Sequence, residues 1–297
     1  MQIGLFAPTA NPFSTPEWLH ALGTHAEERG YHSIWVPEHV VLFDDYASSY
    51  PYAPDGRIPA PPGSGMLEPF TTLAFLAACT STVRLGTGIC LLPQRNPVYT
   101  AKEVANLDWL SGGRVDFGIG VGWLREEFEV VNVPWPNRGR RTDDYVEVCK
   151  ALWCEDPSSY EGTYYTLPSC HMHPKPVQDP HPPLHFGGES DAALARVARV
   201  GQGWYSFNRL PHEVAEGMAR LEEALAVRGR SRADVRVTVC PYFNGLTPEM
   251  VEAYHEAGVD EVTALFFAMT PEDVPAAFDD LQPCLDRLAA ISDRQAG

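Results

Sequence analysis

Short apolar runs alternate with longer amphipathic stretches along the chain. Apolar runs bounded by Gly and Pro predict buried strands, whereas apolar residues at helical spacing predict helices. The first helix shows the signals clearly: Thr15 can cap it, Pro16 fits its first turn, and Trp18 and Leu22 share one face. We predict strands at 3–7, 33–36, 84–92, 114–119, 183–186, 203–207, 235–242 and 261–266, followed in turn by helices at 15–30, 69–78, 97–110, 141–154, 191–200, 211–228, 248–257 and 271–290.

These elements form eight strand–helix units in strict order. Strict alternation implies parallel strands joined by helical crossovers, and eight such units close a barrel. We therefore predict an α/β protein with a (β/α)8 TIM barrel, with an open, doubly wound sheet as the alternative. Two long irregular segments, 42–67 and 156–182, are expected to be insertions after strands 2 and 4. No change of composition divides the chain, so we expect one domain over residues 1–297.

Charge and hydropathy narrow the class of protein. The net charge of −17 and the lack of a long basic tract argue against nucleic acid as a partner. No segment approaches the roughly 18 to 20 consecutive apolar residues of a membrane-spanning helix, and the first residues lack the basic start of a secretory signal. We therefore expect a cytoplasmic protein without a membrane partner. The seven scattered cysteines form no Cys-x-x-Cys pair and are expected to be free thiols.

In such a barrel the active site lies at the C-terminal ends of the strands, so residues that directly follow a strand are the first candidates for chemistry. Glu38 and His39 follow the second strand. An imidazole there can donate to a substrate or cofactor oxygen, or carry a proton near neutral pH. His39 is thus the candidate catalytic residue; the alternative is a histidine that bonds only a loop carbonyl.

Glycines follow three further strands. The segment Gly86-Thr87-Gly88 marks either a place where a flat ring packs on the backbone or a packing kink. The run 118–122 has the spacing G-x-G-x-G, which is not a dinucleotide fingerprint but can let a cofactor chain lie against backbone amides. The turn 187–190 leads into a helix and is either an anion site or an ordinary capped turn.

A histidine-rich segment offers metal-ligand residue types: Cys170, His171 and His173, with His181 and His185 further on. Their spacings match no zinc arrangement, and the surrounding prolines indicate a stiff loop. We therefore expect no metal site.

The densest basic cluster of this acidic chain is Arg138, Arg140 and Arg141. These arginines either clamp an anionic tail of a ligand or lie on the solvated start of a helix, where the dipole does not favour cations.

Several segments resemble the bacterial luciferase-like monooxygenase superfamily, and in particular its branch that uses the deazaflavin coenzyme F420. The resemblance covers most of residues 1–205, and beyond them it is mainly the rhythm of the barrel. The segments that carry it are 30–39 (GYHSIWVPEH), 84–88 (RLGTG), 93–97 (PQRNP) and 110–114 (LSGGR), and for the F420 branch 46–52, 55–57, 118–128 and 138–141.

The resemblance implies a barrel that binds F420, with a hydride passing between the ring of the cofactor and an organic substrate. His39 would contact the ring region and serve in proton transfer, with the acidic Glu38 beside it. Thr87, Gly88 and Ile89 would form a bulge that backs the ring, often with a non-prolyl cis peptide bond. The other residues expected at the cofactor are Gly120, Val121 and Gly122 along its polyol chain, Gly187, Gly188 and Ser190 at its phosphate, and Arg138, Arg140 and Arg141 at its anionic tail.

One departure concerns the substrate. Trp123 stands where sugar-phosphate dehydrogenases of this family have a Glu that transfers a proton, and an indole cannot take a proton from an alcohol. Reduction or oxygenation of a bulkier, more apolar small molecule is therefore favoured. We predict an F420-dependent oxidoreductase. The alternatives are an FMNH2-dependent two-component monooxygenase with a separate cofactor reductase, and a non-catalytic flavin-binding relative of luciferase. A homodimer is common in the family.

Overall fold

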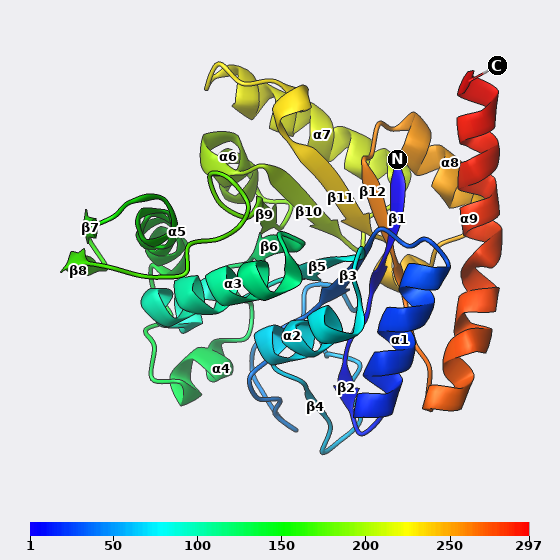
Figure 1. The fold of residues 1–297 in the computed structure, drawn as a ribbon, viewed down its shortest axis with the longest axis horizontal. Coiled ribbons are helices and arrows are strands. Elements are labelled where there is room, and N and C mark those ends of the chain that lie inside the picture. The colour runs from blue at the N-terminus through cyan, green and yellow to red at the C-terminus, as the bar shows by residue number, and fades with distance from the viewer. Residues whose placement is uncertain (297) are drawn as a thin grey trace.

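The centre of the molecule is a closed barrel of eight parallel strands surrounded by helices (Figure 1). The computed structural model describes residues 1–296. The strand order β1-β12-β11-β10-β9-β6-β5-β3 closes on itself, which confirms the predicted (β/α)8 fold and excludes the open sheet. The barrel strands are β1 (Gln2–Phe6), β3 (Ser33–Val36), β5 (Arg84–Thr87), β6 (Val115–Ile119), β9 (Leu184–Gly187), β10 (Gly203–Phe207), β11 (Arg236–Cys240) and β12 (Glu261–Leu265).

The helices begin where the sequence supplies capping side chains and prolines. The side chains of Thr15, Asn96, Ser190 and Thr247 each accept a hydrogen bond from a backbone amide of the first helical turn. These bonds satisfy amides that a helix leaves unpaired at its start. The helices that follow the barrel strands are α1 (Pro16–Glu28), α2 (Pro69–Cys79), α3 (Pro97–Ser111), α5 (Arg138–Cys154), α6 (Asp191–Val200), α7 (Pro211–Ala226), α8 (Pro248–Glu256) and α9 (Val274–Ala296).

The first insertion and the segment after β6 contain short elements that the sequence did not predict. In the insertion, β4 (Gly65–Met66) pairs with β2 (Ala10–Asn11). After β6, a short helix, α4 (Arg125–Val130), precedes α5, which begins at Arg138 rather than at residue 141. A helix of this length is too short to show a periodic pattern. Short 3-10 turns lie at Leu92–Gln94, Arg232–Asp234, Tyr242–Asn244 and Pro271–Asp273.

The second insertion is not wholly irregular, because it holds an antiparallel hairpin of β7 (Ser158–Glu161) and β8 (Thr166–Cys170). β8 contains Pro168, which has no amide to donate to a partner strand. A two-stranded hairpin has only edge strands, however, and an edge tolerates the missing amide of proline. The hairpin lies at the periphery of the molecule, beyond α5 and away from the barrel (Figure 1).

The third barrel strand is shorter than the predicted 84–92. β5 ends at Thr87; the N–H of Gly88 then donates to Val36 O at 2.7 Å, and Cys90 forms a single bridge with Ile119. The peptide bond between Gly88 and Ile89 is cis, as the family resemblance implied. The chain thus leaves the ladder and rejoins it, which is the interruption that the glycines predicted.

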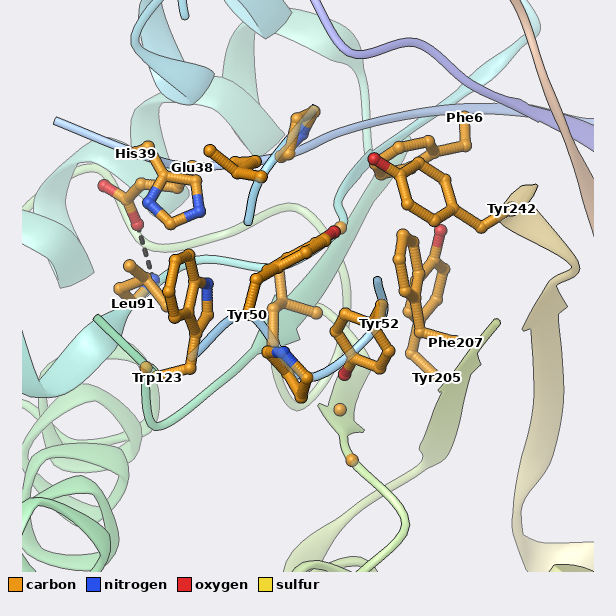
Figure 2. A pocket seen from close by; sticks show the side chains of 18 of the residues that line it. Phe6, Glu38, His39, Tyr50, Tyr52, Leu91, Trp123, Tyr205, Phe207 and Tyr242 are labelled. Carbon is orange, nitrogen blue, oxygen red and sulfur yellow. Dashed lines mark hydrogen bonds between the residues drawn. The ribbon is translucent and has the colours of Figure 1, made fainter. Parts of the chain in front are cut away.

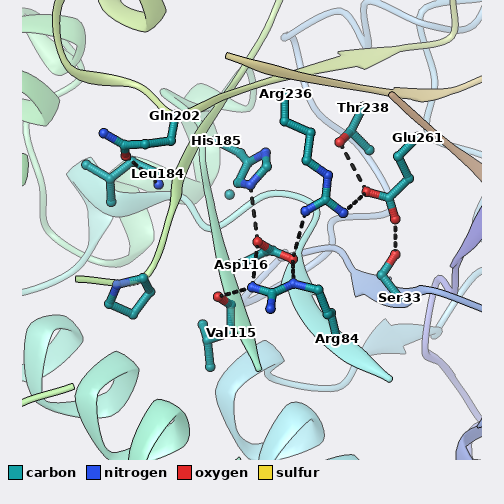
Figure 3. Close-up of polar contacts among 12 residues, drawn as sticks. Ser33, Arg84, Val115, Asp116, Leu184, His185, Gln202, Arg236, Thr238 and Glu261 are labelled. Atoms are coloured by element: carbon teal, nitrogen blue, oxygen red, sulfur yellow. Dashed lines mark hydrogen bonds and ion pairs between the residues drawn. The ribbon is translucent and has the colours of Figure 1, made fainter. Parts of the chain in front are cut away.

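A buried charge network fills the N-terminal end of the barrel interior (Figure 3). Asp116 is fully buried; it accepts hydrogen bonds of 2.6 and 2.9 Å from Arg84, and Arg236 lies 3.6 Å away. Arg236 also pairs with buried Glu261 at 2.6 Å. Burial alone would raise the pKa of Asp116, but the bonds from His185 and Arg84 and the charge of Arg236 hold that pKa well below its usual range. Because this end of a barrel serves stability, we assign the network a structural role.

Two further sequence expectations can be compared with the described residues. None of the helices between residues 1 and 296 is long and apolar enough to cross a membrane. All seven cysteines are free thiols, as their spacing predicted.

Candidate active site

A cavity opens at the C-terminal ends of the barrel strands (Figure 2). The empty space within it, including the open mouth, is about 1050 Å³. The strand ends supply most of its lining, and the first insertion adds Tyr50 and Tyr52. The predicted site residues that line it are Glu38, His39, Gly88, Ile89, Val121, Gly122, Gly187 and Gly188.

His39 lies at the wall of this cavity, directly after β3. Its Nδ1 is 3.2 Å from Oε2 of Glu127, and its ring packs edge-on against Trp123 with the ring centroids 5.6 Å apart. An ionised carboxylate can only accept a hydrogen bond, so it favours the tautomer with the proton on Nδ1 and leaves Nε2 as the basic nitrogen of the neutral ring. The imidazole is therefore oriented by the protein through one nitrogen and can serve a ligand through the other.

Glu127 is a residue of the site that the sequence analysis missed. Its side chain, on α4, is fully buried. Besides His39 it accepts hydrogen bonds from Val40 N at 2.6 Å and from Gln94 Nε2 at 3.1 Å. A buried carboxylate without bonds would be costly, so these donors hold it in one place. No sequence signal separated it from its acidic neighbours, because α4 was not predicted and its inward face was unknown.

Replacing Glu127 by glutamine should lower kcat by about 10-fold or more while the Kd for the cofactor changes little, because the amide no longer fixes the His39 tautomer. Stability should fall by about 1 to 3 kcal/mol as buried donors lose a charged acceptor. Steady-state kinetics and urea unfolding measure the two effects. Glu129→Gln, an exposed position on the same helix, is the matched control. Equal kcat values in both variants would show that Glu127 is not needed to position His39.

Glu38 supports the chain around the bulge. Its carboxylate accepts a hydrogen bond of 2.5 Å from Leu91 N and one of 2.6 Å from Arg95 Nε, and Arg95 also pairs with Glu68 and Glu103. Glu38 thus lines the cavity while both of its oxygens bind protein groups. Its contribution is to hold the segment after β5 against β3.

Large side chains pack closely against two glycines of the barrel. A Cβ on Gly86 would lie 2.3 Å from the indole of Trp35, and one on Gly120 would lie 2.0 Å from Ile89 Cδ1. Close packing against the rigid indole therefore explains Gly86. At Gly120 the neighbouring atom is the flexible end of Ile89, so the expected place of Gly120 at the cofactor stays a prediction. Thr87 is buried and donates to Gly118 O, so its side chain does not face the cavity.

The turn after β9 brings Gly187 and Gly188 to the cavity, with Gly188 at a φ of +105°. The hydroxyl of Ser190 caps α6, since it accepts from Ala193 N at 3.2 Å. Glu189, whose charge would repel a phosphate, instead accepts from Phe207 N at 3.0 Å on β10, and burial raises its pKa. The turn can therefore offer backbone amides to an anion.

The three arginines of the basic cluster have different surroundings. Arg138 donates from Nε to Gly122 O at 3.1 Å, and its guanidinium lies 3.7 Å from the centre of the Trp135 ring. Arg141 is buried and donates to the carbonyls of Pro93 and Pro134, so it is not available to a ligand. Arg140 is exposed. Of the three, Arg138 is thus the one bonded to a residue of the cavity lining, Gly122.

Aromatic rings form much of the remaining cavity wall (Figure 2). The Tyr50 and Trp123 centroids are 5.1 Å apart, and those of Tyr52 and Phe207 are 4.9 Å apart. Burial raises the pKa of Tyr50, so its phenol stays neutral. No Lys or Arg belongs to the cavity lining formed by the described residues. Except for Trp123, the sequence analysis assigned none of these rings to the site.

The insertion that carries Tyr50 and Tyr52 is tied to α4 by Glu126. The Glu126 carboxylate accepts from Ala47 N at 2.7 Å and from Ser48 Oγ at 2.7 Å. Adjacent carboxylates of one short helix therefore bind different parts of the site: Glu126 holds the insertion, and Glu127 holds His39.

The closed barrel with a ring-lined cavity at its strand ends defines the class of protein as a (β/α)8 barrel with a candidate active site at those ends. Residues 1–283 match the family model of the luciferase-like monooxygenases. An uncharacterized protein of Mycobacterium tuberculosis is 32% identical over 258 residues, which are 86% of this chain and 88% of that protein. The chain belongs to the luciferase-like monooxygenase family, whose members are oxidoreductases.

One partial sequence relative and one structural neighbour can be compared with this chain. The FMNH2-dependent dimethylsulfone monooxygenase of Pseudomonas putida is 33% identical over 136 residues, 44% of this chain and 37% of that protein. The structure of an F420-dependent secondary alcohol dehydrogenase, in complex with an F420–acetone adduct, superposes with a TM-score of 0.71 at 20% identity, covering 88% of this chain and 92% of that one. The first is similar in part of its sequence, and the second is similar in fold.

Proposed function

We propose that this chain transfers a hydride between coenzyme F420 and an apolar organic substrate. The observation that carries the proposal is His39, which is held by buried Glu127 and faces a strand-end cavity beside the Gly88–Ile89 bulge. An F420-dependent enzyme of the same fold supports the choice of cofactor.

The residues present fit a deazaflavin. Gly88, Gly187 and Gly188 leave part of the cavity lining free of side chains, where a flat ring and a phosphate can approach the backbone. Gly122 and Val121 would contact the polyol chain, and Arg138 beside Gly122 would face the anionic tail. When bound, the deazaflavin supplies or accepts the hydride.

The chain's own groups provide proton transfer and exclusion of water. Nε2 of His39 donates or accepts the proton that accompanies hydride transfer, while Glu127 holds the ring through Nδ1. The rings of Tyr50, Tyr52 and Trp123 bind the apolar body of the substrate and keep water from the reacting atoms. A lining without a cation disfavours anionic substrates such as sugar phosphates.

A second candidate is an FMNH2-dependent monooxygenase that works with a separate reductase. It is favoured by the similarity to the dimethylsulfone monooxygenase, and the same glycines suit FMN. A non-catalytic flavin-binding protein is disfavoured because it would not need an imidazole fixed at the ring. A homodimer remains a prediction.

Cofactor titration separates the two candidate functions. We expect tighter binding of F420 than of FMN, because only F420 carries an oligoglutamate tail that Arg138 and Arg140 can receive. In an Arg138→Gln/Arg140→Gln variant, the difference between the binding free energies of F420 and FMN should fall by about 1 kcal/mol. This is the scale for charge contacts that solvent partly screens. Isothermal titration calorimetry with both cofactors measures the difference.

The matched control replaces two exposed arginines outside the cavity lining, Arg228→Gln/Arg294→Gln, and should leave the preference unchanged. Equal or tighter FMN binding by the wild-type chain would favour the monooxygenase. If the Arg138/Arg140 variant keeps the full preference for F420 over FMN, the two arginines do not contact the cofactor tail.

A further inference from the structure

The base of the peripheral hairpin brings together three side chains from separate parts of the second insertion. Ser158 of β7 pairs with Cys170 of β8, so Asp156, before β7, and His171, after β8, lie across from one another. Met172 is buried in the core, which places His171 and His173 on the outer side of the chain.

The donor atoms of these three residues converge. The Asp156 carboxylate lies 2.5 Å from Nδ1 of His171 and 3.3 Å from Nε2 of His173. All three ligand atoms lie within 4.8 Å of one another. Among residues 1–296, this is the one group of three such side chains with ligand atoms this close.

The backbone beneath the group is anchored, while the side chains remain accessible. Lys102 Nζ donates to His173 O, and Lys175 Nζ donates to Leu152 O at 2.7 Å and to Glu155 O at 2.6 Å. The exposed fractions of the Asp156, His171 and His173 side chains are 44%, 67% and 60%. A hydrated ion can therefore reach all three, and small rotations would direct them to one point.

We propose that Asp156, His171 and His173 bind one divalent transition-metal ion, with water completing its coordination. Two imidazoles and one carboxylate suit Zn²⁺ and similar borderline ions, whereas Mg²⁺ and Ca²⁺ prefer oxygen ligands alone. Because the site joins the end of α5 to the end of β8, a bound ion clamps the hairpin to the body of the protein. The site lies outside the cavity lining and does not depend on the proposed function.

The sequence analysis expected no metal because it grouped different residues. It weighed His171 and His173 together with His181 and His185. His181 is buried beside Pro182 O, and His185 belongs to the charge network of the barrel. The missing ligand, Asp156, is brought to the histidines by the hairpin, which was not predicted.

Titration with Zn²⁺ tests the site. The wild-type chain should bind one ion near neutral pH by calorimetry, and Zn²⁺ should raise its Tm. Binding should weaken as the pH falls, because protons compete with the ion for the ligand atoms. His171→Ala/His173→Ala should weaken binding by at least about 10-fold, and Asp156→Asn should weaken it as well.

Matched variants exclude other sites. His20→Ala/His212→Ala removes two exposed helical histidines, and Cys154→Ser removes an exposed thiol; both should bind Zn²⁺ as the wild type does. Absence of binding by the wild type would leave Asp156 with two ion-paired histidines and no metal, which overturns the proposal. Equal affinity in the His171/His173 variant, or loss of binding in either control, would place the ion elsewhere and overturn it too.

Discussion

Replacing His39 with alanine should lower turnover by about 100-fold or more, the scale for losing a positioned acid or base. The side chain is held by Glu127 at 3.2 Å and lines the cavity, so its removal deletes the group that we propose moves the proton. Cofactor affinity should change far less, because the glycine-lined surface for the ring and phosphate is untouched. A screen of metabolites against each reduced cofactor first identifies an acceptor. The measurement is then kcat with that acceptor at saturating cofactor.

Two comparisons make the His39 experiment specific. Added imidazole should restore part of the activity of His39→Ala, since the variant leaves a space of that shape next to Glu127. His212→Ala, at an exposed position, should behave as the wild type. Near-normal turnover of His39→Ala would show that this histidine only supports the loop.

Replacing Asp116 with asparagine should lower the free energy of unfolding by about 3 to 5 kcal/mol, the cost of removing one partner from a buried ion pair. Arg84 and Arg236 would remain partly buried without their shared negative charge. Urea unfolding measures the loss. Asp279→Asn, which breaks an exposed pair with Arg29, should cost less than about 1 kcal/mol and serves as the control. Similar losses in both variants would contradict the role given to the network.

The pH dependence of the Asp116 contribution has a definite sign. Its pKa in the folded state lies below the value of about 3.9 in an unfolded chain. The unfolded state therefore binds the proton first, so the stabilisation is complete above about pH 4 and is lost as the pH falls toward the folded pKa. Wild-type stability should decline on the acid side more steeply than that of Asp116→Asn.

The barrel could be predicted from sequence because each of its units carries its own local signals. Strands such as β6 and β10 are short apolar runs, and helices such as α1 and α6 carry their own caps. His39 and the bulge at Gly88 could be located because they follow strands whose ends meet at one face of a barrel.

The rest of the site depends on contacts distant in sequence. Glu127 differs from its acidic neighbours because it lies on the side of α4 that faces the loop after β3. Tyr50 reaches the cavity because of the way the long first insertion folds. The sequence could not separate Arg141 from Arg138, because both lie in the same basic run. In the structure Arg141 is buried and donates to backbone carbonyls. The sequence also could not show that Gly86 is required by the Trp35 indole, because that neighbour lies on another strand.

The attachment of Glu126 and Glu127 to different parts of the site has a mechanical consequence. The segment that carries Tyr50 is bonded to α4 through Ala47 and Ser48, which both donate to Glu126. The same helix sets the direction of the His39 ring. We therefore expect a substitution at Ala47 or Ser48 to disturb the orientation of the His39 ring through α4, although neither residue contacts that ring.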